Sequence, residues 1–433
     1  MTNWKEYKLI DIADFIDYRG KTPNKTTFGV PLITAKIVKN GTIQEPTEYI
    51  SKEDYPKWMT RGFPKVGDIV LTTEAPLGEV AQIKDASFAL AQRIITIRGK
   101  EGIIDNGYLK YFLQSAKGQH RLKERETGTT VTGIKSAELK QVLISAPDIE
   151  TQTAIAEILS SLDDKIELNN KINQELENLA QTLFKQWFID FEFPNENGEP
   201  YKSSGGEMVE SELGEIPKGW EVGILEDLID FSNGNAFKSK ELLKEDIGDC
   251  YHVFKMGHIK KGGGLNADGT KSYYEKSKAK KLDKYVLRVG DLLMCMTDMK
   301  GNVALLGHTA LMNENDKYIV NQRVGLLRPN NDLGIDFPYL YILTNSNNFI
   351  EDLRSRANSG VQVNLSTSEI KVSKVLLPPK AINVAFDNCV KAFFESIFNN
   401  TKENQELTNL RDTLLPKLIS GELEVVEVMA EKA

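Results

Sequence analysis

The sequence is a tandem duplication, and this repetition constrains the fold more than any other feature. Blocks that begin at Trp4, Val66, Gln92, Tyr108 and Asn173 recur in the same order at Trp220, Val289, Gln322, Tyr339 and Asn404. The offset between the copies only grows, from 216 to 231 residues. Five blocks in one order are not expected by chance, so the 433 residues contain two copies of one module.

Each module begins with a segment of mixed α/β character. Short runs of β-branched and apolar residues, bounded by Gly, Pro, Asn-Gly and Asp-Gly turn signals, lie at 68–72 and 93–97 in the first copy and at 291–296 and 323–327 in the second. Helical stretches at 107–124 and 338–356 are interspersed with them. The fold class expected is therefore α+β, with one mixed globular part in each copy.

Each module ends in a long helix, near 151–189 and 381–420. A residue suited to a helix core recurs every seven positions, at Ile155, Leu162, Asn169, Leu176 and Leu183 in the first helix and at Phe386, Phe393, Asn400, Leu407 and Leu414 in the second. Ile158, Ile172 and Leu179, and in the second copy Cys389 and Leu410, form the adjoining seam. We expect an antiparallel coiled coil with pseudo-two-fold symmetry, in which Asn169 and Asn400 face each other. The alternative is that each helix packs only against its own globular part.

These patterns divide the chain into six segments. We expect a first globular domain at 1–148, a helical region at 149–192, an exposed Gly-, Pro-, Ser- and Glu-rich linker at 193–217, a second globular domain at 218–379, a second helical region at 380–424 and a tail at 425–433.

Charge is distributed unevenly over these segments. The net charge of −8 resolves into +4 for 1–148, −11 for 149–217, +2 for 218–379 and −3 for 380–433. Mildly basic globular parts can neutralise phosphates, so the acidic total does not exclude nucleic acid, although scattered surface charge explains the values as well. Three cysteines without C-x-x-C spacing, and the lack of an apolar run of about 18 residues, predict a cytosolic protein.

The sequence shows no convincing catalytic constellation. His120, His252, His258 and His308 do not have metal-ligand spacing, and surface or loop positions are expected for them. The Gly-rich stretch 262–272 is not a phosphate loop, because Thr270 separates its last glycine from the lysine. Two heads on a rigid spacer instead suit a ligand with two sites at fixed separation, such as DNA half-sites about 34–36 Å apart.

Three segments resemble one family. Residues 147–188, with Pro147-Asp148-Ile149-Glu150-Thr151-Gln152 and Leu183-Phe184-x2-Trp187-Phe188, resemble the first conserved region of type I restriction–modification specificity subunits. Residues 211–220 (SELGEIPKGW) resemble the beginning of their second recognition domain, and residues 414–423 (LLPKLISGEL) resemble the end of their second conserved region. Residues 381–384 depart from the pattern, because they lack the acidic-Gln pair found at Glu150 and Gln152.

The resemblance implies a division of labour. Each globular part would be a target-recognition domain that reads one half of a bipartite double-stranded DNA sequence, and the helix pair would set the spacer. Two modification subunits, which bind S-adenosylmethionine and methylate adenine N6, would dock on the helical regions. Restriction subunits that use ATP and Mg²⁺ would join them. This chain itself would bind no cofactor or metal and catalyse nothing. Candidate docking anchors are Trp187, Phe188, Phe393 and Phe394.

Candidate DNA-contacting residues are polar side chains expected on loops, because Arg, Lys, Asn and Gln make the base-edge contacts. They are Arg19, Lys21, Thr22, Gln92, Arg93, Thr129 and Thr130 in the first copy, and Asn233, Asn235, Lys238, Lys260, Lys261, Gln322, Arg323 and Gln362 in the second. The first loop of each copy, with Arg19 or Asn233, is expected to follow an equivalent first helix. Residues shared by both copies, such as the Gln-Arg pairs, favour a fold or phosphate role over base reading. The lysine run 276–284 fits either a phosphate grip or a solvated helix face.

Three functions remain open from these residues. The first is a non-catalytic DNA-specificity subunit. The second is a nuclease–methyltransferase fusion, which would require catalytic motifs that the sequence does not show. The third is a duplicated protein-binding scaffold, against which the basic residues Arg19, Lys21, Lys260 and Lys261 weigh modestly.

Overall fold

Each compact unit of the protein is assembled from parts of both modules. The computed structural model describes residues 4–20, 22–128, 132–299, 303–330, 332–359 and 362–425. Unit 1 comprises Met1–Asn169 with Lys402–Ala433, and unit 2 comprises Asn170–Thr401. A unit therefore contains one globular head, half of one long helix and part of the other.

Unit 1 is built around a four-stranded antiparallel sheet with strand order β2-β11-β8-β9. A second sheet, with order β10-β4-β7-β3, and the pairs β1–β12 and β5–β6 complete the head. The elements are β1 (Lys5–Lys8), α1 (Leu9–Ile12), β2 (Ala13–Asp17), β3 (Lys25–Thr26), β4 (Val30–Ile33), β5 (Val38–Lys39), β6 (Thr42–Ile43), β7 (Tyr49–Ile50), α2 (Tyr55–Trp58), β8 (Ile69–Thr73), β9 (Leu77–Gln82), β10 (Ala89–Leu90), β11 (Ile94–Gly99), α3 (Asn106–Gln114), α4 (Ala116–Lys123), α5 (Ser136–Lys140), β12 (Leu143–Ala146), the first part of α6 (Ile149–Phe188) and the last part of α10 (Lys380–Ser420).

Unit 2 repeats this arrangement. The sheet β16-β23-β19-β21 and the pair β15–β26 correspond to β2-β11-β8-β9 and β1–β12. The elements are β13 (Met208–Ser211), β14 (Gly214–Pro217), β15 (Glu221–Ile224), η1 (Leu225–Asp227), β16 (Ile229–Asn233), η2 (Ser239–Glu241), β17 (Cys250–Phe254), η3 (Met256–His258), β18 (Tyr273–Glu275), η4 (Lys276–Lys278), η5 (Asp283–Tyr285), β19 (Leu292–Cys295), β20 (Thr297–Met299), β21 (Thr309–Leu311), β22 (Tyr318–Val320), β23 (Val324–Pro329), α7 (Phe337–Asn345), α8 (Asn347–Ser355), β24 (Asn358–Ser359), β25 (Gln362–Asn364), α9 (Thr367–Lys371) and β26 (Lys374–Leu377), with η denoting 3-10 helices.

The expected strands and long helices are present, whereas each expected short helix is broken once. Ser115 separates α3 from α4, and its hydroxyl accepts a hydrogen bond from the Gly118 amide, which caps the second helix. Ser346 separates α7 from α8 at the equivalent place. An added Cβ at Gly118 would lie 2.0 Å from the Phe112 carbonyl oxygen, so glycine permits this close turn.

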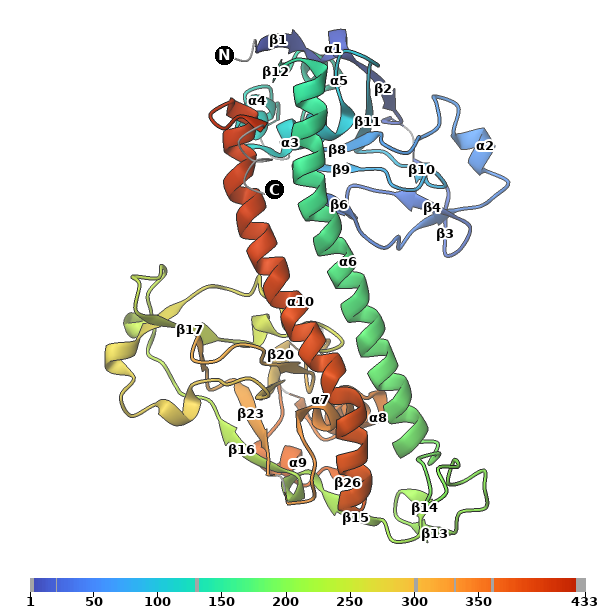
Figure 1. The fold of residues 1–433 in the computed structure, drawn as a ribbon, viewed down its shortest axis with the longest axis vertical. Helices are drawn as coiled ribbons and strands as arrows, with labels where there is room; N and C mark the ends of the chain where they lie inside the picture. Colours follow the sequence, from blue (N-terminus) through green and yellow to red (C-terminus); the bar gives the residue numbers. More distant parts are fainter. Residues whose placement is uncertain are drawn as a thin grey trace. The chain divides into compact units, whose positions relative to one another are not determined.

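The core of unit 1 lies where the head meets the long helices (Figure 1). Helix α3 packs on the sheet through β9 and β11 and approaches α6 closely, because an added Cβ at Gly107 would lie 2.9 Å from the Ala156 Cβ. Ile155 and Leu159 of α6 and Leu418 of α10 belong to the same buried cluster. Both helices thus pack on the head as well as on each other.

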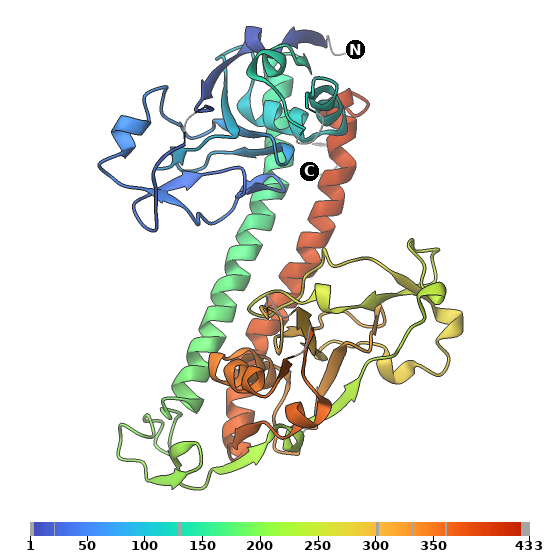
Figure 2. The ribbon, with the colours of Figure 1, turned by 180° about the vertical axis from the view of Figure 1, so that it is seen from behind.

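The two long helices pair in antiparallel fashion, as predicted. In unit 1, Asp163 of α6 contacts Arg411 of α10. In unit 2, the Trp187 ring of α6 lies 5.8 Å from the Phe386 ring of α10. Within each unit, α6 and α10 therefore run in opposite directions (Figure 2).

In each seven-residue repeat, the second position that faces the partner helix lies four residues after the first, and not three as predicted. Ile172, Leu179 and Leu410 are 40–46% exposed, and Cys389 is exposed as well. The buried or half-buried positions instead follow the first by four residues, as at Leu159, Ile166, Asn173, Ala180 and Trp187, and at Val390, Ile397, Asn404, Arg411 and Leu418. Among the predicted core residues, Ile155, Leu162, Asn169 and Phe386 are buried, and Leu176, Leu183, Phe393, Asn400, Leu407 and Leu414 are half-buried.

Each asparagine of the predicted core bonds an asparagine at this neighbouring position. The Asn169 Nδ2 donates to Asn404 Oδ1 at 2.9 Å in unit 1, and the Asn400 Nδ2 donates to Asn173 Oδ1 at 2.8 Å in unit 2. The expected Asn169–Asn400 pair is thus replaced by two pairs that are equivalent under the duplication. The reason is the same shift of the seam by one residue.

The beginnings of α6 and α10 form equivalent hydrogen bonds through different residues. In unit 1 the Gln152 amide donates to the Pro147 carbonyl, and its oxygen accepts from the Asp105 amide at 2.9 Å. The equivalent Asn383 still donates to the Pro378 carbonyl. Asp387, one turn later, accepts from the Asp336 amide at 2.8 Å in its place. The missing acidic-Gln pair is therefore compensated by Asn383 and Asp387 together.

Several buried aromatic residues correct other expectations. Trp187, Phe188 and Phe394 lie in the core of unit 2 and are not exposed anchors, while Phe393 is half-buried. The segment 193–217 is largely exposed, yet it forms the β13–β14 hairpin, and Phe193 stacks between Tyr201 and Trp220. His252 and His258 are buried in unit 2, because Tyr273 and Tyr318 stack on His252 with ring centroids 5.2 and 5.0 Å away.

Candidate nucleic-acid interface

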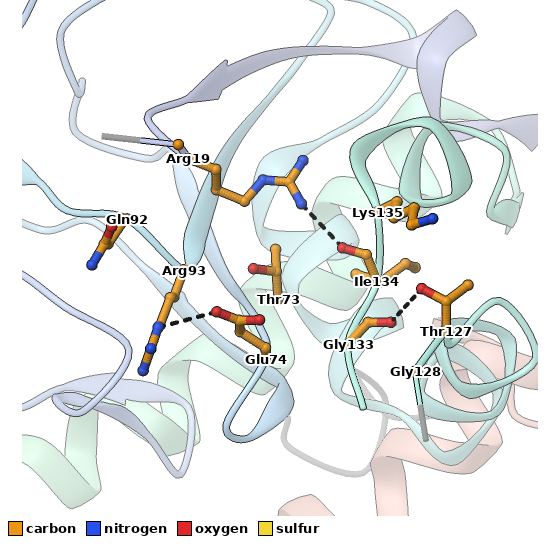
Figure 3. A pocket seen from close by; sticks show the side chains of 11 residues that line it. Arg19, Thr73, Glu74, Gln92, Arg93, Thr127, Gly128, Gly133, Ile134 and Lys135 are labelled. Atoms are coloured by element: carbon orange, nitrogen blue, oxygen red, sulfur yellow. Dashed lines mark hydrogen bonds and ion pairs between the residues drawn. The ribbon is translucent and has the colours of Figure 1, made fainter. Parts of the chain in front are cut away.

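Four loops of the first head surround one cavity of about 620 Å³ (Figure 3). They lie at 19–20 after β2, at 73–74 at the end of β8, at 92–93 before β11, and at 127–128 and 133–135 before α5. The cavity brings together Arg19, Gln92 and Arg93 from the predicted set. Lys21, Thr129 and Thr130 lie outside the described residues.

Backbone hydrogen bonds hold three of these loops together. The Thr73 amide donates to the Arg93 carbonyl oxygen at 2.9 Å, and the Ile134 amide donates to the Thr73 carbonyl oxygen at 2.9 Å. The second head repeats both bonds. There the Met296 amide donates to the Arg323 carbonyl oxygen, and the Leu365 amide donates to the Met296 carbonyl oxygen. The Gln-Arg pair therefore occupies the same place in the backbone frame of both heads.

Arg19 stabilises the loops, and its guanidinium is already engaged. It forms a two-pronged ion pair with Asp17 and donates to the Ile134 carbonyl oxygen at 3.1 Å. Although burial opposes ionisation of Asp17, the hydrogen bonds from Arg19 lower the pKa of this carboxyl. The loop follows strand β2 rather than a helix, and in the second head it follows β16, which corrects the sequence expectation.

Gln92 and Arg93 present their side chains at the mouth of the cavity. The Thr22 hydroxyl donates to Gln92 Oε1 at 3.0 Å. The Arg93 Nε lies 3.0 Å from Glu74 Oε1, and both side chains are partly exposed, at 56% and 41%. Arg93 has φ +70, in the left-handed region that non-glycine residues rarely adopt. Glu74 was not among the predicted residues, although it follows β8 where the two copies differ.

The predicted residues of the second head fall into three groups. Asn233 and Asn235 lie next to the Gln-Arg turn, since the backbone amide of Gln322 donates a hydrogen bond to the Asn235 carbonyl oxygen. Gln322, Arg323, Lys238 and Gln362 are exposed. Lys260 and Lys261 are exposed on a separate turn at 260–264.

The lysine run 276–284 forms the two short turns η4 and η5 and not one helix face. Three of its five lysines contact other side chains of the protein. Lys278 pairs with Glu275, and the Nζ atoms of Lys276 and Lys284 lie 5.1 and 4.8 Å from the rings of Tyr251 and Tyr285.

The repeated Gly-Asp motif has a role in the fold. Asp68 receives two hydrogen bonds from Arg98, at 2.7 Å each, and Asp291 receives two from Arg328, at 2.7 and 2.8 Å. Both carboxylates are almost fully buried, so each pair fixes the sheet from which the candidate loops project. Among the described residues, no group of three or more His, Cys, Asp or Glu could hold a metal ion.

Comparison with known proteins assigns the family. The sequence model described as "Type I restriction modification DNA specificity domain" matches twice, at residues 1–178 and 217–409. The chain belongs to the type I restriction–modification specificity subunits. The two matches of this specificity subunit fall on the two copies of the duplication, and each covers one head with most of the following long helix.

Similar proteins match over nearly the whole length of the specificity subunit. The type I restriction enzyme MjaIX specificity subunit of Methanocaldococcus jannaschii is 30% identical, over 98% of this chain and 95% of its own. The HindI specificity subunit of Haemophilus influenzae is 26% identical, over 98% and 100%. A crystal structure of a type I S subunit from M. genitalium has the same fold, with a TM-score of 0.56 at 18% identity and 96% coverage of both chains. None of the described helices is long and apolar enough to cross a membrane.

Proposed function

We propose that this chain is the non-catalytic subunit that recognises the DNA target sequence in a cytoplasmic type I restriction–modification complex. Each head would read one half of a bipartite double-stranded DNA target. The antiparallel helix pair would set the number of unread base pairs between the halves. The observation that carries this proposal is the double match of the specificity-domain family on two heads that share one loop frame.

The chemistry would reside in partner subunits. Two modification subunits would bind S-adenosylmethionine and methylate adenine N6, and each target adenine would leave the base stack to enter their active site. Restriction subunits would add ATP- and Mg²⁺-dependent translocation and cleavage. Because Trp187, Phe188 and Phe394 are buried in unit 2, we expect the modification subunits to contact other parts of the helical regions. The protein-scaffold alternative is not favoured by the family assignment.

The proposal is tested by sequencing methylated adenines in a host that carries this chain and its modification subunit. We expect a split motif with an unspecified gap, and we expect that motif to disappear when this chain alone is deleted. Unchanged methylation after the deletion would contradict the proposal. Arg93→Ala and Arg323→Ala, one in each head, should weaken or alter recognition of different halves of the motif.

A further inference from the structure

The two heads differ at the position that directly follows the shared backbone ladder. Glu74 follows Thr73 in the first head, and Thr297 follows Met296 in the second, at the same step of the backbone ladder. The Thr297 hydroxyl is buried and donates to Asn364 Oδ1 at 2.9 Å. Glu74 instead extends its carboxylate toward Arg93 at the cavity (Figure 3). Two heads that read different bases must differ where they read, and this position meets that requirement.

A carboxylate in a DNA-facing cavity has a restricted set of ligands. It repels phosphate, so it cannot act as a backbone contact. On the base edges of the major groove, a carboxylate binds an exocyclic amine, either N4 of cytosine or N6 of adenine. A guanidinium binds the O6 and N7 acceptors of guanine. The Glu74–Arg93 pair therefore offers an acceptor beside a donor, at a separation of 3.0 Å.

A G·C base pair presents the complementary pattern. Guanine O6 and cytosine N4 are hydrogen-bond partners within the pair, so an acceptor edge and a donor edge lie side by side in the major groove. One acidic and one basic side chain held next to each other can contact both bases at once. An A·T pair in one orientation also places an acceptor, thymine O4, beside a donor, adenine N6, but it has the thymine methyl group where guanine N7 would accept the second hydrogen bond of the guanidinium. The other orientation places an acceptor opposite the carboxylate, so each orientation loses one contact.

The local backbone holds the pair ready for such a contact. Of the five described non-glycine residues with positive φ, Arg93 (φ +70) and Ala75 (φ +50) directly adjoin this ion pair. Strained backbone of this kind persists where the surrounding structure enforces it, and it is concentrated at binding sites. Here the hydrogen bonds of Thr73 to the Arg93 carbonyl, and of Thr22 to Gln92, supply that enforcement.

We infer that Glu74 and Arg93 together read one G·C base pair in the half-site of the first head, an inference that rests on the proposed function. The carboxylate accepts from cytosine N4 and the guanidinium donates to guanine. Thr297 offers no carboxylate, so the second half-site does not require a G·C pair at the equivalent position.

The test uses the full chain with its modification subunit, first in the host and then as a purified complex. The wild-type methylation motif defines both halves. Glu74→Gln keeps the size of the side chain and removes its charge, and Arg93→Lys removes the two-pronged donor. Both should relax the same single G·C position in the same half, with a loss of roughly ten-fold or more in discrimination against other base pairs. Binding of the purified complex to duplexes substituted at each base pair should show the same loss.

Control variants separate base reading from general damage. Glu101→Gln changes an exposed glutamate in a turn of the same head and should leave the motif intact. Arg323→Lys should affect only the other half. If Glu74→Gln abolishes methylation altogether, Glu74→Asp decides: recovery of the wild-type motif supports a carboxylate reader, and continued loss overturns it.

Other outcomes would also overturn the inference. If Glu74→Gln leaves the motif and its methylation unchanged, the pair is only a surface ion pair. If both halves relax together, Glu74 acts on the fold and does not read a base. Either result would leave the proposed function intact as long as deletion of the whole chain abolishes the split motif.

Discussion

Asp163 on α6 is the centre of a partly buried hydrogen-bond network in unit 1. Its carboxylate accepts hydrogen bonds from Lys110 at 2.9 Å, Tyr111 at 2.6 Å and Arg411 at 2.9 Å. Burial opposes its ionisation, but Lys110, Tyr111 and Arg411 lower its pKa. The network joins helix α3 to α6 and α10, so it fixes how the head packs on the helices within this unit.

Removal of the Asp163 carboxylate should lower the free energy of unfolding. Asp163→Ala would leave the buried Lys110 ammonium without a counter-charge, and we expect a loss of about 3 kcal/mol or more in the free energy of unfolding. Asp164→Ala is the matched control, because the neighbouring Asp164 pairs with Lys84 at an exposed site and should cost less than about 1 kcal/mol. Urea unfolding of the two variants measures the difference. Equal losses would show that the buried network contributes no more than a surface pair.

Asp387 gives unit 2 a defined pH dependence. Burial raises the pKa of this carboxyl to about 7, although the hydrogen bond from the Asp336 amide opposes this rise. The folded state therefore holds a proton that the unfolded state releases near its ordinary value of 3.8, so this group's contribution to stability falls as pH rises through the window from 3.8 to about 7. His252 acts in the opposite sense, because burial lowers its pKa to about 4 and its contribution is lost as pH falls below 6.5.

The first copy suggests the variant that removes this dependence. Asn383→Gln combined with Asp387→Ala reproduces the residues found at Gln152 and Ala156. We expect the double variant to be more stable than the wild type at pH 8, and its stability to vary less between pH 5 and 8. Thermal unfolding across that range is the measurement. Asp387→Ala alone would leave the Asp336 amide unpaired and should be less stable than the double variant, and the opposite order would contradict the proposed exchange.

Some residues of the candidate site could be predicted from the sequence, and others could not. Arg93 and Gln92 could be found because they recur in both copies, and recurrence marked the shared frame. Glu74 could not be found in the same way, because it lies where the copies differ and a difference carries no signal by itself. Arg19 was expected to contact DNA, yet Asp17 occupies its guanidinium, and a contact of this kind depends on backbone geometry rather than on residue type.

At the scale of elements, the centre of the helix pair is polar in both units. Asn169 is 1% exposed and donates to Glu403 at 2.7 Å as well as to Asn404. A buried amide pair lowers the stability of a coiled coil but restricts its register. The exposed apolar residues that flank it, such as Leu168 and Ile172, would otherwise favour a shifted pairing.

This polar centre can be examined with a double-mutant cycle. Asn169→Leu alone should cost about 1–2 kcal/mol, because it leaves the partner amide with a lost bond. Asn169→Leu with Asn404→Leu should recover that loss, and light scattering should then reveal a mixture of association states. The same cycle on Gln174 and Asn178, an exposed pair within α6, should give almost no coupling energy. A vanishing coupling for Asn169 and Asn404 would exclude a register role.

The elements themselves were largely predictable, while the contacts between them were not. The seven-residue spacing predicted both helices and their antiparallel pairing, because a long apolar stripe requires a partner. The same spacing misplaced the adjoining seam by one residue, since positions three and four residues on are both neighbours on a helix surface. The burial of His252 between two tyrosines had no signal in the sequence, because stacking joins residues from β17, β18 and β22.

At the scale of the whole molecule, unit 1 joins the two ends of the chain. Leu418 and Ile419 are buried in the core of the first head, and an added Cβ at Gly421 would lie 2.7 Å from the Trp4 indole nitrogen. Unit 2, in contrast, is a single stretch of the chain from Asn170 to Thr401. The duplication predicted two similar heads, but not that the first head would be completed by the last helix.

Truncation should therefore affect the units unequally. Removal of residues 402–433 deletes part of the core of unit 1 and leaves all residues of unit 2 in place. We expect amide hydrogen exchange to become fast throughout 4–146 and to stay slow in β19 and β23. Removal of residues 426–433 alone is the control and should change neither. Uniform loss of protection in both units would show that they do not fold independently.

Because α10 completes the core of unit 1, the order of synthesis also determines when each unit can fold. The first head is synthesised before the second, yet Leu418 and Ile419 are added only after the second head. Unit 2 has all its residues once Thr401 has been added, whereas the core of unit 1 lacks Leu418 and Ile419 until the chain has been elongated further. The first head thus completes its core only after the second head has been synthesised, and until then it exposes apolar surface to which chaperones can bind.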